Sequence, residues 1–390
     1  MLRRHLIAAL AIAALVFAAL PAMAQKPAKI GLILPMTGPF ASTGRQIEAA
    51  AKLYVAQHGD IVAGRKIELI VRDDTGAPDV TKRIAQEMVL NDQVQFLGGF
   101  GLTPLAFAAA PVATESKTPL IVMAAATSVI TEQSPYIVRT SFTLPQVTVG
   151  IADYAAKQGG KRAITLVADY APGLDAEKAF KERFAQAGGQ TVEELRVPLR
   201  SPDFAPFLQR VVDAKPDTLF VFTPVGLGAQ FIKQFVERGL DKSGIRLVAT
   251  GDVTDDEILN EVGEPLLGLI TTHHYSALHD SPENKAFVEG IRKANNNLRP
   301  NFMGVGGYDG IHLIYEALKK TNGSSDGTAL VEAMKGMSWV SPRGPISIDA
   351  KTRDIVQNVY VRKVEKVNGE LYNVEFATIE KVADPVKAAK

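Results

Sequence analysis

The chain has 390 residues, 46% of them hydrophobic and 22% charged, which is too long for one hydrophobic core and predicts two domains in an ordinary globular protein. Its formal net charge of +1 gives no electrostatic basis for binding nucleic acid or an anionic membrane surface. The absence of cysteine excludes disulfides, thiolate metal sites, a cysteine nucleophile and a lipid-anchored N-terminal cysteine.

Residues 1–24 have the features of a secretory signal peptide. Arg3 and Arg4 precede an apolar run over residues 6–20, and the small residues around Met23 form a cleavage site, so Gln25 is the predicted first mature residue. The apolar run is too short to cross a bilayer comfortably, and no later stretch approaches that length. We therefore expect export to a bacterial periplasm without membrane insertion. Loss of the two arginines would leave a formal net charge of −1.

The first 140 residues alternate between short β-branched runs and helical patterns. One helix is expected over residues 45–57, where Ile47, Ala51 and Val55 share a face, and another begins at Pro78. The spacing leaves room for crossover helices, so it predicts parallel strands in βαβ units. The expected strands are Lys29–Leu34, Lys66–Arg72, Val94–Leu97, Leu120–Met123 and Tyr136–Thr140.

The stretch PLIVMAAATS, residues 119–128, begins as a buried strand and ends in three alanines and two hydroxyl residues. In open parallel sheets, ligands bind beyond the carboxyl ends of the strands, where loops meet helix N-termini. Ala125 and Ala126 would let a ligand approach the backbone, and Thr127 and Ser128 can donate hydroxyl hydrogen bonds. This pattern fits a carboxylate site. An ordinary strand exit with a helix cap is the alternative.

A glycine-rich loop, GGFGLT over residues 98–103, also follows an expected strand and precedes a helical pattern. It has neither the G-x-x-x-x-G-K-[ST] nor the G-x-G-x-x-G spacing of nucleotide-binding loops. Backbone amides from Gly101 to Thr103 could hold an anion. A tight turn without a ligand is the alternative.

A second α/β series follows the first. Its helices include Asp175–Gln186 and Ala229–Arg238. Two successive series of similar length predict two similar lobes rather than one sheet of ten or more strands. The expected strands are Ala163–Ala168, Thr191–Val197, Thr218–Phe222, Arg246–Thr250 and Leu269–His273.

The C-terminal part breaks this alternation. Glu283–Ala294 and Gly310–Lys320 are expected helices, and Ile355–Lys366 and Leu371–Glu380 are expected strands of a hairpin around Asn368-Gly369. If the helices return to the first lobe and the hairpin to the second, the chain crosses between lobes more than once and forms a hinge. In the predicted division, lobe 1 consists of residues 25–145 and 276–344, and lobe 2 consists of residues 146–275 and 345–380. Residues 381–390 are expected to form a flexible tail.

Other polar motifs favour structural roles. His273-His274, with His279 nearby, is an unpromising metal site because adjacent strand residues point to opposite faces, although one of the pair could line a cleft. Asp73-Asp74 ends a strand and residues 255–257 open a helix, where acids are solvated or act as caps. The sequence has no G-x-S-x-G and no H-E-x-x-H motif. We therefore expect neither an enzyme nor a bound cofactor.

Several motifs occur in an order that is informative as a set: IGLILPMTGPF over residues 30–40, Gly44, Asp73-Asp74, AAT over 125–127, Arg139, Asp169-Tyr170, Gly173 and GYD over 307–309. On these residues the chain, from about Lys29 to Glu380, resembles the leucine/isoleucine/valine-binding family of periplasmic solute-binding proteins, the soluble partners of ABC importers. The resemblance implies an α/β fold of two similar lobes, each a parallel-type sheet flanked by helices, joined by a three-stranded hinge.

The resemblance also implies a ligand site. A carboxylate would be held by first-lobe amides and hydroxyls, with Ala125 and Thr127 among them, while Tyr308 would lie in the wall. Asp252 would stand near the acidic partner of an α-ammonium group. These assignments carry the family's positions onto this sequence.

Other positions depart from the family pattern. Leu102 stands where Ser or Thr is usual, with Thr103 beside it; Thr43 replaces a bulkier residue; and Pro172 and Pro224 fall at aromatic positions. Burying an ammonium without its partners is costly, so the pocket favours a ligand with fewer charges. An aromatic or aliphatic carboxylate would need the anion loop and an apolar wall, for which Phe40, Phe100 and Tyr170 are candidates. Asp252 argues for an amino acid, and both ligand classes stay open.

The sequence therefore predicts a monomeric, non-enzymatic periplasmic receptor that delivers a small carboxylate-bearing solute to the permease and ATPase components of an ABC importer. A sensory protein of the same fold, acting with a separate signalling partner, is one alternative. A two-lobed α/β enzyme is another, and it would need a catalytic constellation in the cleft that the sequence does not offer.

Overall fold

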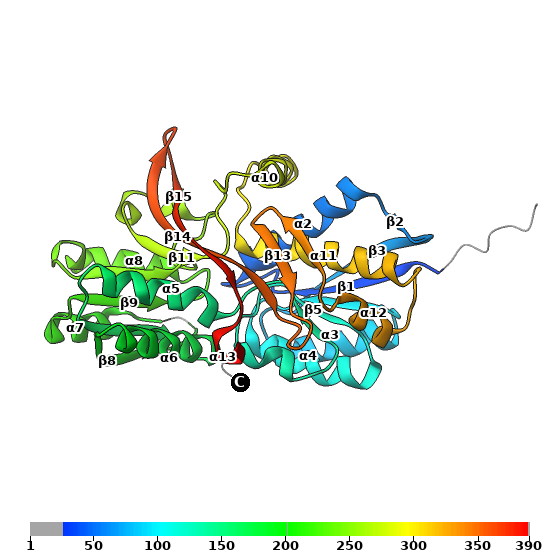
Figure 1. Cartoon of the computed structure of the whole chain (residues 1–390), viewed down its shortest axis with the longest axis horizontal. Coiled ribbons are helices and arrows are strands. Elements are labelled where there is room, and N and C mark those ends of the chain that lie inside the picture. The colour runs from blue at the N-terminus through cyan, green and yellow to red at the C-terminus, as the bar shows by residue number, and fades with distance from the viewer. Residues whose placement is uncertain (1–25, 201, 389–390) are drawn as a thin grey trace, which may run out of the picture.

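A computed structural model describes residues 26–200 and 202–388, which form two lobes side by side (Figure 1). The predicted signal peptide and Gln25 lie outside the described residues. Each lobe has its own sheet with helices on its faces, as the sequence predicts. Among the helices of the described residues, none has the length and apolarity of a membrane span.

The first sheet has the strand order β2-β3-β1-β4-β5-β6 and is parallel except for the short β2. Alternate residues of β1 enter two different cores: Ile30 and Leu32 pack with α2, whereas Ile33 packs with α3 and α4. Helices α10, α11 and α12 also belong to this lobe, and α11 packs along α2. The strands are β1 (Ala28–Leu34), β2 (Ile61–Val62), β3 (Arg65–Asp73), β4 (Phe96–Gly99), β5 (Leu120–Val122) and β6 (Ile137–Arg139), and the helices are α2 (Ala41–His58), α3 (Pro78–Leu90), α4 (Thr103–Ser116), α10 (Pro282–Ala294), α11 (Phe302–Lys320) and α12 (Gly327–Met334).

The second sheet has the order β12-β13-β14-β11-β10-β9-β7-β8, with β15 paired to β14. Strands β7 to β11 are parallel, but β12 to β15 are antiparallel, so this sheet is mixed rather than purely of the parallel type. Its strands are β7 (Arg162–Ala168), β8 (Gln190–Val197), β9 (Thr218–Phe222), β10 (Arg246–Thr250), β11 (Ile270–His273), β12 (Ser338–Ser341), β13 (Gly344–Ile348), β14 (Ile355–Val367) and β15 (Glu370–Val382), and its helices include α5 (Leu144–Lys157), α6 (Ala171–Gln186), α7 (Ala205–Ala214), α8 (Gly228–Glu237) and α9 (Leu259–Val262).

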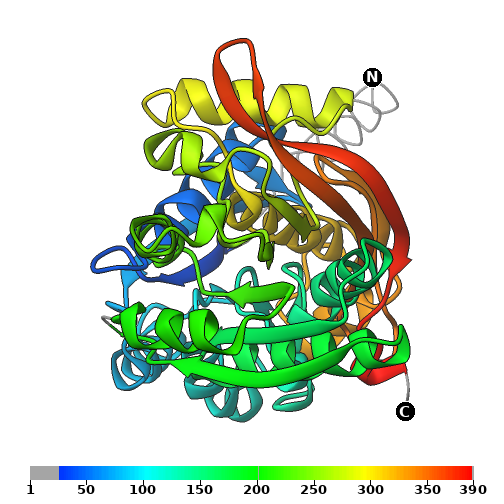
Figure 2. The same cartoon turned by 90° about the vertical axis from the view of Figure 1, so that its left-hand side faces the viewer.

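The chain passes between the two lobes three times, after β6, after β11 and after α12. Figure 2 shows the long ribbon of β14 and β15 curving along one side of the molecule. The sequence assigns residues 338–344 to the first lobe, but β12 and the start of β13 pair into the second sheet. These two short strands were not predicted.

Helix α11 begins at Phe302, eight residues before the predicted start at Gly310. Glycines near its beginning disfavour a helix by propensity, but here they permit close packing. A Cβ on Gly306 would lie 2.3 Å from the backbone oxygen of Met123, and one on Gly307 would lie 3.0 Å from that of Ile47. Tertiary contact with the first sheet and α2 therefore overrides helix propensity.

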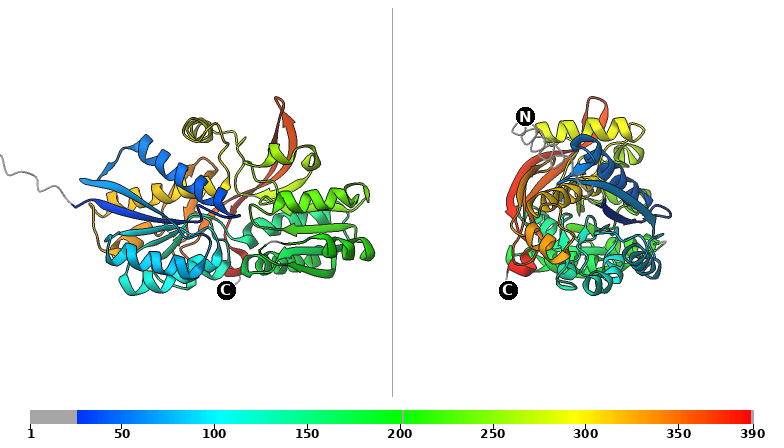
Figure 3. Two further views of the ribbon diagram at one scale, coloured as in Figure 1. Left: turned by 180° about the vertical axis from the view of Figure 1, so that it is seen from behind. Right: turned by 90° about the vertical axis from the view of Figure 1, so that its right-hand side faces the viewer.

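The expected flexible tail is wrong for the described residues up to 388. β15 continues to Val382, and α13 (Pro385–Ala388) lies beneath the junction of the lobes in front and rear views (Figures 1 and 3). The Lys387 ammonium is buried there, with Nζ 2.5 Å from Oδ2 of Asp354 and 2.6 Å from Oγ1 of Thr131. This buried ion pair therefore fixes the end of the chain that the sequence predicts to be flexible.

Candidate functional site

A cavity lies between the carboxyl ends of the two sheets. Its volume is about 350 Å³. Both lobes contribute walls: the first gives the loops after β1, β4 and β5, and the second gives the loops after β7, β9 and β10. The lining residues are Phe40, Thr43, Gly101, Leu102, Thr103, Ala124, Ala125, Ala126, Phe142, Leu144, Tyr170, Pro172, Phe222, Pro224, Val225, Asp252 and Met303.

The three alanines after β5 form part of this wall. Ala124, Ala125 and Ala126 are buried and line the cavity. Larger side chains at these positions would fill it. The Ala125 amide donates to the carbonyl of Phe100 at 3.0 Å, so it is not free for a ligand. Among the described residues, the Ala126 amide has no acceptor within hydrogen-bond distance. The small side chains thus leave room beside one free backbone donor.

The loop after β4 brings the start of α4 to the cavity. Gly99 and Phe100 have φ angles of 110° and 66°, and this left-handed turn directs the chain into the helix at Thr103. Thr103 is only 1% exposed, lines the cavity, and its Oγ1 has no hydrogen-bond partner in the described part of the chain. The dipole of a helix N-terminus favours an anion, although Pro104 has no N–H and the amides of Leu105 and Ala106 donate to the carbonyl of Leu102. A buried hydroxyl without a partner adds a donor for it.

The opposite wall comes from the second lobe and is largely apolar. Tyr170 precedes α6 and its ring stacks on Phe222 at the end of β9, with centroids 6.1 Å apart and planes 14° apart. Pro172, Pro224 and Val225 complete this side. Pro172 and Pro224, which stand at aromatic positions of the family, therefore line the cavity. The aromatic surface of this wall comes from Tyr170 and Phe222 instead.

Asp252 is the only acidic or basic side chain among the lining residues. It follows β10 and is 3% exposed. Its Oδ2 accepts a hydrogen bond from Thr250 Oγ1 at 2.9 Å and lies 3.5 Å from Nε2 of His273. Burial, with the nearby charge of Asp252, raises the pKa of the Tyr170 hydroxyl well above its usual value, so Tyr170 is a neutral donor.

Seven of the ten predicted site residues line the cavity, namely Phe40, Leu102, Thr103, Ala125, Ala126, Tyr170 and Asp252. The other three lie elsewhere. The Phe100 ring is buried in the core under α3 and α4, because the left-handed turn points it away from the cavity. Tyr308 is on the face of α11 that packs on α2, and its hydroxyl donates to Oε1 of Gln57 at 2.7 Å. Thr127 is buried outside the lining.

The sequence did not indicate five further lining residues, Phe142, Leu144, Phe222, Val225 and Met303. Phe142 and Leu144 lie in the first crossing between lobes, and Met303 lies in the first turn of α11. Only Phe222 carried a signal, because it ends a predicted strand of the second series, and Val225 lies in the loop that follows it. The other three residues reach the cavity only because the chain returns to it after crossing between the lobes.

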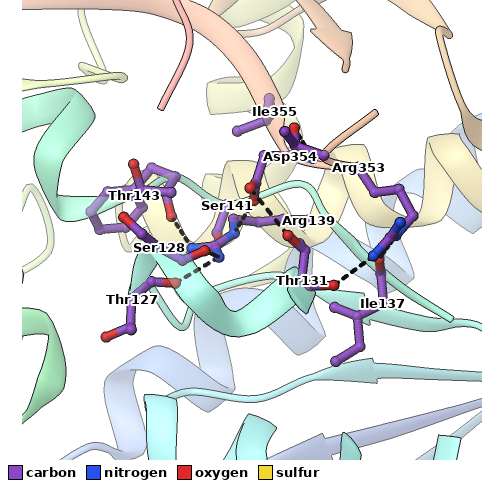
Figure 4. Close-up of polar contacts among 12 residues, drawn as sticks. Thr127, Ser128, Thr131, Ile137, Arg139, Ser141, Thr143, Arg353, Asp354 and Ile355 are labelled. Carbon is purple, nitrogen blue, oxygen red and sulfur yellow. Dashed lines mark hydrogen bonds and ion pairs between the residues drawn. The ribbon is translucent and has the colours of Figure 1, made fainter. Parts of the chain in front are cut away.

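Arg139, at the end of β6, lies between Thr127, Ser128 and Asp354 (Figure 4). Its guanidinium is fully buried and donates to the carbonyls of Thr127 at 2.7 Å and Phe142 at 2.9 Å, with longer contacts to Ala125 and Ser128. Nε lies 2.7 Å from Oδ1 of Asp354, the residue that precedes β14. These contacts fix the carbonyls of Ala125, Thr127 and Ser128, while the carbonyl of Ala126 accepts a hydrogen bond from the Leu144 amide at 3.0 Å.

A second buried arginine ties two crossings together. Arg343, between β12 and β13, lies 2.7 Å from Oδ2 of Asp309 and donates to the carbonyls of Thr140 and Ser141. Trp339 also donates to Asp309, through Nε1 at 2.9 Å. The GYD motif of residues 307–309 therefore serves hinge structure, not the ligand wall.

His273 and His274 are buried together beside the hinge. Their rings lie 4.5 Å apart and both contact Phe142, because β11 ends at His273 and the backbone turns. The expectation that the pair points to opposite faces is therefore wrong. Burial lowers the pKa of His273 to about 4, against the raising effect of Asp252, with Arg362 and Arg343 lowering it further. Burial and His273 also lower the pKa of His274. Both rings are neutral near pH 7.

Metal-ligating residues are not gathered anywhere in the described ranges, where no three His, Asp or Glu side chains are placed to hold an ion. His279 lies apart from the histidine pair, with Nδ1 2.9 Å from Oε2 of Glu375.

The two lobes also touch at the rim of the cavity. Glu257, which follows β10, accepts hydrogen bonds from Ser42 Oγ at 2.8 Å and Gln46 Nε2 at 2.6 Å, both on α2. Arg200 of the second lobe donates to the carbonyl of Gly76 in the first at 3.0 Å. These contacts describe a closed arrangement of the lobes around the cavity.

A family described as "Periplasmic binding protein" matches residues 27–369. The chain belongs to that family. A Brucella melitensis protein named "Leu/Ile/Val-binding protein homolog 6" is 47% identical over 92% of this chain and 93% of its own length. The predicted resemblance, the type I two-lobed fold and the solute-binding class of function are confirmed.

Two solved structures are similar over almost the whole chain. A solute-binding protein of an ABC transporter from Rhodopseudomonas palustris BisB5, in complex with 3,4-dihydroxybenzoic acid, is 62% identical, with a TM-score of 0.91 over 93% of this chain and 99% of that chain. A solute-binding protein from R. palustris HaA2, in complex with p-hydroxybenzoic acid, is 43% identical, with a TM-score of 0.91 over 94% and 100%.

Proposed function

We propose that the protein is the periplasmic receptor of an ABC importer and that it encloses an aromatic monocarboxylate of the benzoate type between its lobes. The single observation that carries this proposal is the buried, unpartnered hydroxyl of Thr103 at the N-terminus of α4, facing a cavity with aromatic walls. The benzoate-type acids bound by the two R. palustris relatives support the same ligand class.

The cavity suits this ligand chemically. The acid group would be held by neutral donors, the hydroxyl and amide of Thr103 and the amide of Ala126. The nearly parallel rings of Tyr170 and Phe222 in the wall offer an apolar surface against which a flat ring can pack. Closure of the lobes would remove water and strengthen the hydrogen bonds to the carboxylate.

The remaining assignments follow from the receptor function. We propose that residues 1–24 are removed on export and that the mature monomer meets a permease and an ATPase. A receptor of this kind would release its bound solute unchanged. Mass spectrometry of the periplasmic protein, beginning at Gln25, and of solute recovered after binding tests these two points.

The ligand class is tested by thermal unfolding and calorimetry of the mature protein with benzoate, 4-hydroxybenzoate, 3,4-dihydroxybenzoate, L-leucine, L-valine and L-phenylalanine. A ligand at 100 times its dissociation constant stabilises the folded state by about 2.7 kcal/mol. We expect that stabilisation from the aromatic acids. Binding of L-leucine without binding of any aromatic acid would overturn the proposal in favour of the amino-acid ligand that the name of the Brucella relative suggests.

A further inference from the structure

Asp252 has an unused acceptor inside the cavity. Oδ2 is occupied by Thr250 and approached by His273, but no donor among the described residues contacts Oδ1. The carboxylate forms no ion pair with a lysine or arginine of the described chain. Because Asp252 lines the cavity, this oxygen can accept a hydrogen bond from a donor of the ligand.

The charge of Asp252 limits what can approach it. No lysine or arginine lines the cavity, so nothing there neutralises a second anion. A carboxylate bound at Thr103 must therefore keep away from Asp252, and the part of the ligand that reaches Asp252 must be a hydrogen-bond donor without negative charge. The two residues come from opposite lobes, Thr103 from the loop after β4 and Asp252 from the loop after β10.

An α-ammonium and a ring hydroxyl are both donors, but they differ in position. In an α-amino acid the ammonium and the carboxylate share one carbon, whereas in a hydroxybenzoate they are separated by the ring. Thr103 and Asp252 come from opposite lobes, and Tyr170 and Phe222 give the second-lobe wall an aromatic surface, so the cavity favours a ligand whose acid and donor lie at opposite ends of a ring.

We propose that Asp252 selects the ligand by accepting a hydrogen bond from a ring hydroxyl, so that the receptor takes hydroxylated aromatic acids, discriminates against those that cannot donate there, and excludes aromatic dicarboxylates. This inference rests on the proposed function and deepens it. It assigns Asp252 a role in specificity that differs from pairing with an ammonium group.

The first test needs only the unmodified protein. Calorimetry compares 4-hydroxybenzoate with 4-methoxybenzoate and benzoate, which have no donor at that position, and with terephthalate, which has a second carboxylate. We expect 4-hydroxybenzoate to bind about 10 to 100 times more tightly than the two donor-free acids, as for loss of a hydrogen bond to a charged group. Terephthalate should not bind measurably. Equal affinity for 4-hydroxybenzoate and 4-methoxybenzoate would overturn the inference while leaving the proposed function intact.

The second test uses Asp252→Leu, which keeps the size of the side chain and removes both oxygens. The ratio between 4-hydroxybenzoate and benzoate should fall to about one. Glu257→Gln is a matched control, because Glu257 is an acid of the same loop region that contacts α2 and does not line the cavity. It should weaken both ligands by the same factor and keep their ratio.

The outcomes separate the two proposals. If no aromatic acid binds the unmodified protein, the proposed function fails. If aromatic acids bind but the preference for the hydroxyl persists in Asp252→Leu, another residue reads the hydroxyl and this inference is wrong. If Asp252→Leu does not fold, the comparison of 4-hydroxybenzoate with 4-methoxybenzoate in the unmodified protein still decides it. Tight binding of L-leucine that is lost in Asp252→Leu would assign Asp252 to an ammonium and overturn the inference.

Discussion

Replacing Thr103 with valine should have opposite effects on the free and the bound protein. The Thr103 hydroxyl is buried and has no partner among the described residues, and such a group costs about 1–3 kcal/mol. Valine has the same shape without the hydroxyl. The free energy of unfolding of the ligand-free protein should therefore stay the same or rise by about 1 kcal/mol.

Ligand binding should weaken in the same variant. A hydrogen bond to a charged carboxylate contributes about 1.5–3 kcal/mol, so the dissociation constant for a benzoate-type acid should rise about 10 to 150 times. Urea unfolding without ligand gives the first quantity, and titration calorimetry gives the second. Both should be measured on the mature protein at one pH.

The control is Thr165→Val, because Thr165 lies in β7 with a buried and unpartnered hydroxyl but does not line the cavity. It should show the same change in unfolding free energy with no change in affinity. If Thr103→Val bound the acid as tightly as the unmodified protein, the carboxylate would not be at the start of α4. If Thr103→Val were destabilised without ligand, the hydroxyl would have a structural partner and the reasoning would fail.

Three further predictions concern stability. Burial lowers the pKa of His273 to about 4, so between pH 6.5 and 4 the imidazole binds a proton in the unfolded protein but not in the folded protein. The unfolding free energy should therefore fall by up to about 3 kcal/mol as the pH is lowered across that range. His273→Gln should remove this part of the pH dependence, which chemical denaturation at several pH values measures. Lys387→Met removes one of the two cations that contact Asp354, which keeps its pairing with Arg139; loss of this hydrogen bond between charged groups should cost about 1.5–3 kcal/mol by urea unfolding, whereas an unchanged midpoint would mean that α13 is not docked in solution. Gly306→Ala places a methyl group 2.3 Å from a backbone oxygen and should lower the melting temperature by several degrees.

The elements of the two parallel series could be predicted because each is a local pattern. The apolar runs and their spacing gave β1, β3, β4, β5 and β7 to β11 close to their observed bounds, and the hairpin turn at Asn368-Gly369 gave β14 and β15. What failed depends on contacts between distant segments. The glycines at the start of α11 fit a helix only because α2 and the loop after β5 pack against them, and no local pattern carries that information.

The site was predictable where a residue follows a strand. Ala125, Thr103, Tyr170 and Asp252 all do, and all line the cavity. Phe100 also does, but the left-handed turn at that residue reverses the direction of its ring. The sequence gives the position of a residue along a loop and not the side to which its side chain points.

In the proposed arrangement, a rigid loop of the first lobe holds the acid group of the ligand, and Asp252 of the second lobe selects the ligand. In the first lobe the loop at residues 125–128 is fixed by Arg139, whose charge is neutralised by Asp354, the residue before β14, so contacts within the protein would hold the proposed anion site in place without a ligand. Asp252 is carried by the other lobe and comes into play only when the lobes close, a state in which Glu257 reaches α2. A carboxylate could then bind to the first lobe alone, but only a ligand that satisfies Asp252 would stabilise the closed form. The receptor would thus discriminate between ligands when the lobes close, because a ligand shifts the equilibrium between the open and closed forms only by the difference in its affinity for them.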